Sequence, residues 1–161
     1  MLKILVSASM LAFLPGCSKS PARANPCDLL PLAEAQSLDS TIVKTQWLPQ
    51  KKGAKDELCF YEDANGEPRV MLFVWHQKPS DAHSTVRSGM KSAADRIVDV
   101  GGVGEQAAAG FSYAEGDVLK LFAAQSKSGM VGIRVRDPVK EGDPKFGDLK
   151  AVAAKALARL K

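Results

Sequence analysis

The fold is decided by residues 58–76, which read Leu58-Cys-Phe-Tyr-Glu-Asp-Ala-Asn-Gly-Glu-Pro-Arg-Val-Met-Leu-Phe-Val-Trp-His76. Asn65-Gly66 lies between two apolar runs and predicts a β-hairpin, because a type I′ turn needs positive φ at both central residues. The two strands are expected at Leu58–Glu62 and Arg69–His76. In Val70–Trp75 both alternating faces are apolar, which predicts a central strand that is covered on two sides.

Further strands and two long helices are expected on either side of this hairpin. The apolar residues of Ser80–Ala94 recur every three or four positions, and Asp81 lies near its start, where a helix favours negative charge. Phe146–Leu160 has the same spacing. Asp28 is expected to cap a shorter helix that follows it. Alternating or β-branched segments predict five more strands, at Thr41–Leu48, Ile97–Val100, Ala108–Ala114, Val118–Ala124 and Met130–Arg136.

This order of elements predicts an α+β fold, in which the two main helices pack on an antiparallel sheet. The alternative is an α/β fold, which is disfavoured because strands and helices do not alternate regularly. Three strands followed by a helix occur twice, about 60 residues apart, which suggests a βββα pseudo-repeat. That suggestion rests on the order of the elements alone, since no residue identities recur.

The N-terminus has the pattern of a lipoprotein signal peptide. Lys3 precedes an apolar run that is shorter than the roughly 20 residues needed to span a bilayer. Leu14-Pro15-Gly16-Cys17 then resembles a lipobox, in which cleavage follows the small residue and the thiol of Cys17 takes diacylglycerol. We expect residues 1–16 to be removed, residues 17–26 to form the lipidated cysteine and a flexible tether, and residues 27–161 to form a single α+β domain. The alternative is an ordinary cleaved signal peptide.

The predicted location is the cell envelope. Ser18 follows the cysteine where aspartate would signal retention in the inner membrane, so we expect a lipid anchor in the outer membrane, facing the periplasm. A host with a single membrane is the alternative. Cleavage would remove Lys3 and no acid, which lowers the net charge from +4 to +3. This weak positive balance suits contact with an envelope protein or anionic polymer and gives no support to nucleic-acid binding.

If Cys17 carries lipid, Cys27 and Cys59 remain as an even pair. Exported proteins fold in an oxidising compartment, so a disulfide between Cys27 and Cys59 is expected. It would close a loop of about 33 residues and contribute roughly 3 to 4 kcal/mol. The alternative is a redox-active or metal-binding pair of cysteines, which would require CxxC spacing or nearby histidine and cysteine ligands.

No pattern of catalytic, cofactor-binding or metal-binding residues is predicted. Gly102-x-Gly104-x-x-Ala107 resembles the spacing of a dinucleotide-binding loop. Such a loop must be followed by a helix whose N-terminus binds the pyrophosphate, and Gly110 and Gly116 argue against a helix here. These glycines are interpreted as a tight connection between the two halves. His76 and His83, with Asp81 between them, are too few for a typical zinc site and are expected to be ordinary surface residues. Exposure of Trp47 or Trp75 would indicate a binding face.

Three short motifs resemble an uncharacterised family of small bacterial lipoproteins. They are the opening Pro26-Cys27-Asp28-Leu29-Leu30 followed by Ala33-Glu34, the strand Cys59-Phe60-Tyr61, and the turn Gly102-Val103-Gly104-Glu105-Gln106-Ala107. The resemblance covers most of the chain after the tether. It implies similarly placed cysteines and an α+β domain with an antiparallel sheet, and it implies no activity.

Three functions are considered on these grounds. The favoured one is a lipid-anchored binding or interaction module of the envelope with an unknown ligand, since the chain has an anchor and a tether but no catalytic pattern. The alternative is a structural or assembly accessory of an envelope complex, which should expose a large apolar patch. An envelope hydrolase is the least favoured, because it would require a pocket with convergent polar groups, for instance around His76 and His83.

Overall fold

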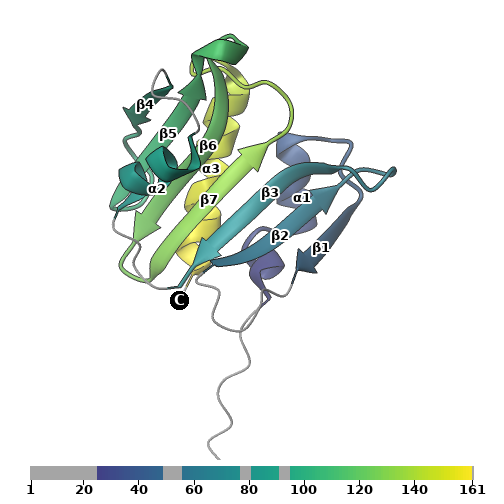
Figure 1. Cartoon of the computed structure of the whole chain (residues 1–161). Helices are drawn as coiled ribbons and strands as arrows, with labels where there is room; N and C mark the ends of the chain where they lie inside the picture. Colours follow the sequence, from purple (N-terminus) through teal and green to yellow (C-terminus); the bar gives the residue numbers. More distant parts are fainter. Residues whose placement is uncertain (1–24, 49–55, 77–80, 91–94, 161) are drawn as a thin grey trace, which may run out of the picture.

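The computed structural model describes residues 25–48, 56–76, 81–90 and 95–160. It has the α+β fold that the sequence predicts, with helices packed on one antiparallel sheet of seven strands in the order β1-β2-β3-β7-β6-β5-β4 (Figure 1). The strands are β1 (Lys44–Leu48), β2 (Asp56–Glu62), β3 (Pro68–Trp75), β4 (Arg96–Asp99), β5 (Gln106–Ser112), β6 (Val118–Ser126) and β7 (Gly129–Val135). The helices are α1 (Leu32–Leu38), α2 (Ala82–Gly89) and α3 (Pro144–Arg159), with 3₁₀ turns η1 (Pro26–Leu29) and η2 (Tyr113–Glu115).

The predicted hairpin is present as β2 and β3, but its turn differs from the expected type I′. Only Gly66 has positive φ, at +82°. The Asp63 side chain closes the loop instead, by accepting hydrogen bonds from the backbone N–H of Asn65 at 2.9 Å and of Glu67 at 3.0 Å. The Gly66 N–H also donates to the Asp63 carbonyl at 3.0 Å. This is the longer loop in which a turn precedes one left-handed residue, so a single glycine is sufficient.

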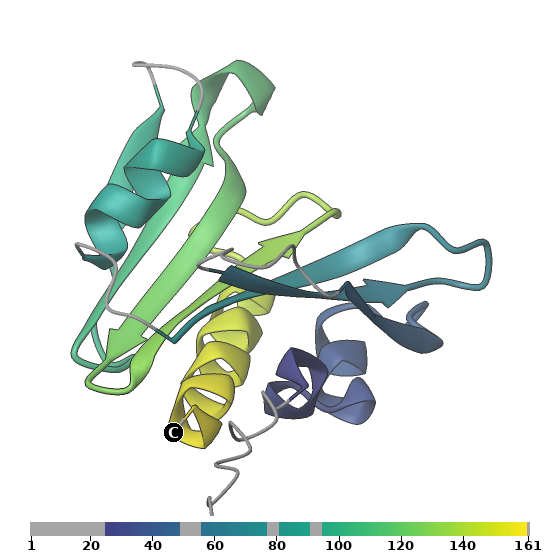
Figure 2. The same cartoon turned by 60° about the horizontal axis from the view of Figure 1, so that its bottom comes forward.

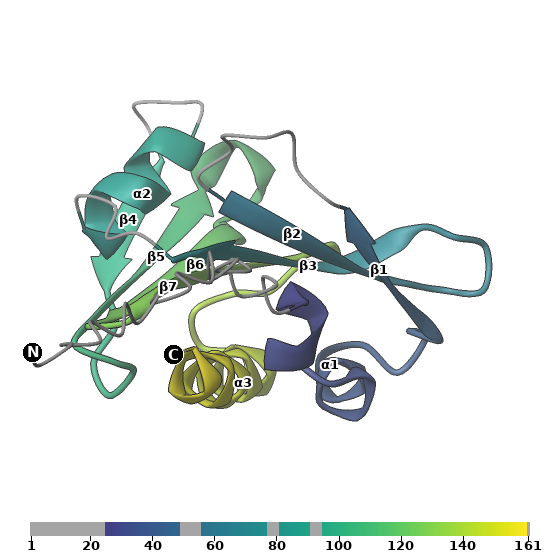
Figure 3. The same cartoon turned by 90° about the horizontal axis from the view of Figure 1, so that it is seen from below.

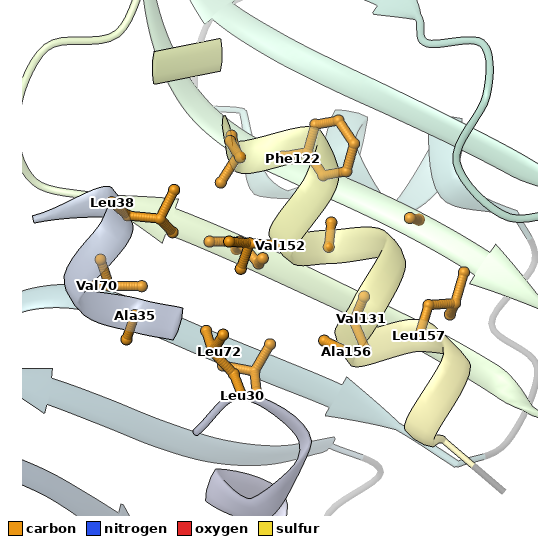
Figure 4. Packing of buried hydrophobic residues seen from close by; sticks show 14 of the residues in the cluster. Leu30, Ala35, Leu38, Val70, Leu72, Phe122, Val131, Val152, Ala156 and Leu157 are labelled. Carbon is orange, nitrogen blue, oxygen red and sulfur yellow. The ribbon is translucent and has the colours of Figure 1, made fainter. Parts of the chain in front are cut away.

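The main core lies between the sheet and a layer formed by η1, α1 and α3. Figure 3 shows this layer below the sheet and α2 above it, and Figure 2 shows the same separation from another angle. Leu72 of β3, Val131 of β7 and Val152 of α3 meet in this core, as Figure 4 shows. The hydroxyl of the fully buried Tyr61 donates to the carbonyl of Leu30 at 2.7 Å, which satisfies a polar group that would otherwise be costly there.

The helix α3 confirms the predicted amphipathic stripe at the C-terminal end. Pro144 occupies its first turn, where a missing backbone N–H costs nothing. The buried side chains recur every three or four positions, and the alanines among them allow close packing on β6 and β7. These residues are Phe146, Leu149, Val152, Ala153, Ala156 and Leu157. Arg159 then joins α3 to α1 through two hydrogen bonds to the Glu34 carboxylate, at 2.8 and 2.7 Å.

The helix α2 packs on the opposite face of the sheet and is shorter than the predicted Ser80–Ala94, parts of which lie outside the described residues. The Asp81 side chain caps it by accepting from the Ser84 N–H. A Cβ atom on Gly110 would lie 2.7 Å from Val86 Cγ1, so this glycine permits the close approach of α2 to β5. A second, smaller core results, comprising Ala82, Val86, Ala108, Leu121, Ala123 and Met130.

One sequence-based expectation about the elements is wrong, and a second holds only in part. Asp28 lies inside η1 and caps nothing; Asn25 caps η1 through a hydrogen bond from the Cys27 N–H at 3.0 Å, and α1 has no side-chain cap. The βββα pseudo-repeat holds for the order of the elements and not for the packing of the helices, because α2 packs on β4, β5 and β6 rather than on the three strands before it. The second set also contains a fourth strand, β4.

Candidate functional site

A disulfide joins Cys27 to Cys59, as the sequence predicts, with an S–S distance of 2.03 Å. It fastens η1 to the inner face of β2, and both cysteines are buried. This bond therefore has a structural role, and the alternative of a redox or metal-binding pair is not supported. The predicted lipid-bearing Cys17 and the signal peptide lie outside the described residues.

In the described parts of the chain, His76 and His83 do not form a metal site with a third ligating side chain. His76, at the end of β3, has its Nε2 3.3 Å from a carboxylate oxygen of the buried Glu57. His83 lies in the first turn of α2. Residues 25–48, 56–76, 81–90 and 95–160 contain no group of three histidine, cysteine or acidic side chains that could hold a metal ion.

The glycine motif is a turn between β4 and β5, and not a dinucleotide-binding loop. Ala107, where such a loop would lead into a helix, lies within β5. Gly104 has a φ of +64°, and a Cβ atom there would come within 2.3 Å of the Gln125 carbonyl oxygen. The glycine is required for packing. The turn closes the β4–β5 hairpin within the second set of strands, so it is not a connection between the two halves.

One half of the sheet face that carries α2 has no described helix on it. The helix α2 lies over β4, β5 and β6, and none of the described helices lies over the same face of β1, β2 and β3 (Figure 3). Residues that are directly paired in an antiparallel sheet share a face, and here Leu58 pairs with Phe73 and Phe60 pairs with Met71. The partly exposed hydrophobic residues of this face form an apolar strip, which comprises Leu48, Leu58, Phe60, Met71, Phe73 and Trp75.

The expectation that β3 is a central strand covered on both sides holds in part. Phe73 and Trp75 pack against the second core, but this face of β3 is covered less completely than the inner face of β3. Its inward residues Val70, Leu72 and Val74 are fully buried, whereas Met71, Phe73 and Trp75 are not. The rings of Phe73 and Trp75 stack at a centroid distance of 6.0 Å. Trp47, on the edge strand β1, is 37% exposed. Both tryptophans that were named as indicators of a binding face are thus accessible to some degree.

A cavity of about 550 Å³ lies beside the strip. Its walls come from the end of α2, the η2 turn, β6, β7 and β3, and Met71 belongs both to the cavity and to the apolar strip. Met90 and Val118, both partly exposed, supply further apolar surface. Three basic residues also line the cavity: Lys120, Arg134 and Arg136.

Arg134 differs from the other basic residues of the cavity. Lys120 pairs with Glu115, and Arg136 pairs with Glu67. Arg134 has no ion pair with any carboxylate of the described residues, and its Nε is buried without a hydrogen-bond partner. The guanidinium lies 5.5 Å from the centre of the Phe73 ring, which is a cation–π distance.

The position of Arg134 follows from the register of the sheet. It lies directly across from Met71 on β3, and its Nη2 lies close to Gly89, since a Cβ on that glycine would be 3.5 Å from it. The alternation of residues in the predicted strand Met130–Arg136 places Arg134 and Arg136 on one face of β7. It could not indicate that one of these arginines lacks a partner, because the carboxylates of Glu67 and Glu115 come from distant turns.

No protein family, curated protein or solved structure matched the chain in the comparisons with known proteins. The resemblance to small bacterial lipoproteins therefore stays a prediction. Among the described residues, no helix is both long and apolar enough to cross a membrane.

Proposed function

We propose that the chain is a lipid-anchored ligand-binding module of the cell envelope, held by Cys17 and binding its ligand in the cavity beside the apolar strip. The observation that supports binding is the cavity itself. Its volume of about 550 Å³ lies within the range of roughly 300–1,000 Å³ that is usual for small-molecule sites. The observations that support anchoring are the lipobox-like Leu14–Cys17 and the polar tether after it.

The cavity favours binding over catalysis. Its acidic side chains, Asp95 and Glu115, are engaged in other interactions, and its lining serine, Ser112, is buried. The two histidines are not among its lining residues. A hydrolase would need a nucleophile or general base that converges with other polar groups at one point. Apolar walls with one unpaired cation resemble instead the usual composition of a site that holds a molecule without transforming it.

The binding part of the proposal is tested with N-phenyl-1-naphthylamine, an uncharged apolar probe that fluoresces when it leaves water. We expect saturable binding to the purified protein. Ala114→Trp, which places a large side chain at the cavity wall, should weaken it at least tenfold. Ala151→Trp, on an exposed position of α3, is the matched control and should bind normally. Equal binding by both variants would mean that the probe lies elsewhere. Absence of binding, together with co-purification of one envelope protein at a fixed ratio, would favour the assembly accessory instead.

The anchoring part is tested separately in cells. Cys17→Ser should accumulate as an uncleaved precursor without lipid, because the thiol that accepts the diacylglycerol is missing. Ser18→Ala, one residue further on, is the control and should mature and fractionate with the membrane. A Cys17→Ser protein of mature size in the membrane fraction would disprove the lipobox.

A further inference from the structure

We propose that the ligand of this cavity is an anionic amphiphile whose acidic head group pairs with Arg134 and whose apolar body lies on Met71, Met90 and Val118. The inference rests on the proposed binding function and adds the chemical class of the ligand. It follows from three features of the cavity, which are the unpaired charge, the neutralised surroundings and the apolar walls.

The unpaired charge is the first feature. Removing a guanidinium from water is costly unless a hydrogen-bonding partner replaces the water. Arg69, Arg96, Arg136 and Arg159 all have carboxylate partners in the structure. Among the described residues, the interaction that is found for the Arg134 guanidinium is with the face of Phe73, and its Nε is shielded from solvent without a hydrogen-bond partner. A carboxylate or phosphate in the cavity would supply the acceptor that the planar guanidinium suits best.

The neutralised surroundings are the second feature. Lys120 and Arg136 are each compensated by a glutamate, Glu115 and Glu67 respectively. Asp95, the other acid at the wall, is engaged in an interaction of its own. The charge of Arg134 is therefore the one left uncompensated, and it gives the cavity its preference for an anion.

The apolar walls are the third feature. Met71 and Met90 have flexible, polarisable side chains that adapt to irregular apolar ligands. Met71 is also the point where the cavity meets the apolar strip, and it pairs across the sheet with Arg134 on one side and Phe60 on the other. A ligand with its head at Arg134 can thus extend its apolar part over Met71 towards Phe60. A small hydrophilic anion would leave these walls unused.

The test compares four compounds with the same ten-carbon chain, namely decanoate, decyl phosphate, 1-decanol and decyltrimethylammonium. Binding to the full-length protein is measured by calorimetry below the micellar concentration. We expect decanoate or decyl phosphate to bind at least tenfold more tightly than the alcohol, and the cation to bind weakest. The two anions differ only in their head group, so their order distinguishes a fatty-acid-like ligand from a phospholipid-like one.

Arg134→Met should bring the affinity for the anions down to that of the alcohol while leaving the alcohol unchanged. Arg87→Met is the matched control, since it removes the same charge from an exposed position on α2 that does not line the cavity. Arg134→Lys keeps the charge without the planar fork and should lie between wild type and Arg134→Met. Near-ultraviolet circular dichroism checks that each variant is folded.

Equal affinity of the wild type for decanoate, decyl phosphate and 1-decanol would overturn the inference about the anion while leaving the binding function intact. So would an Arg134→Met variant that behaves like Arg87→Met. If none of the four compounds nor the naphthylamine probe binds, the proposed binding function itself fails, and the inference fails with it.

Discussion

Loss of the disulfide should be the most damaging covalent change to this fold. Cys27 and Cys59 are separated by 32 positions, so the bond closes a loop of about 33 residues, for which the chain-entropy model gives about 3.7 kcal/mol at 25 °C. For a domain of this size the unfolding entropy is near 0.28 kcal/mol per kelvin, which converts the loss to a fall in Tm of roughly 10–13 °C. The double variant Cys27→Ala/Cys59→Ala is preferred to single changes, because it leaves no unpaired thiol in the core.

Urea unfolding, followed by tryptophan fluorescence with and without a strong reductant, separates the bond from the packing of the sulfur atoms. The reduced wild type should unfold near the midpoint of the double variant, and reductant should not change the double variant. Titration of thiols under denaturing conditions should find Cys27 and Cys59 unreactive until reductant is added. A double variant within 1 kcal/mol of wild type, or a wild-type midpoint that ignores reductant, would show that the bond contributes little to stability.

Three further predictions concern single side chains. Gly104→Ala should destabilise the fold by about 2 kcal/mol or more, because the φ of Gly104 is +64° and the new Cβ would lie 2.3 Å from the Gln125 carbonyl oxygen. The control is Gly101→Ala, which has open space around it and should stay within about 0.5 kcal/mol of wild type. Urea unfolding measures both variants. Hydrogen bonds from Arg159 hold the pKa of Glu34 below its ordinary 4.5. The ion pair therefore stabilises the protein above pH 4.5 by up to about 1 kcal/mol, and this stabilisation is lost as the pH falls through the pKa of Glu34 in the folded protein. Glu34→Gln should abolish this part of the pH dependence of the unfolding free energy between pH 6 and pH 3. Phe146→Ala should cost about 3–4 kcal/mol, since the ring is buried against Phe111 and Phe122 at 5.8 and 6.2 Å, and calorimetric unfolding would measure it.

The parts of the fold that were predicted well are those in which local pattern and tertiary environment agree. The stripe that begins at Phe146 has the period of a helix and is buried along the face that the period selects. The strand predicted from Thr41 failed at its start for a local reason. The Asp39 carboxylate accepts from both the backbone N–H and the hydroxyl of Thr41, at 2.9 and 2.6 Å, which holds Thr41 in a turn, and the strand begins only at Lys44. Side-chain to backbone bonds of this kind compete with a strand even where the residues are β-branched.

The candidate site was less predictable because it depends on which half of the sheet α2 covers. The sequence shows that both faces of Val70–Trp75 are apolar. This pattern does not distinguish a strand that is fully covered from a strand with one face partly exposed. The position of α2 distinguishes them, and Gly110 permits that position, because the absence of a side chain there lets Val86 approach β5 closely. With α2 held there, Met71 and Phe73 remain partly exposed, and the cavity forms where the helix ends. The arginine without a partner and the apolar strip therefore have one structural origin, which is the placement of a short helix on half a sheet.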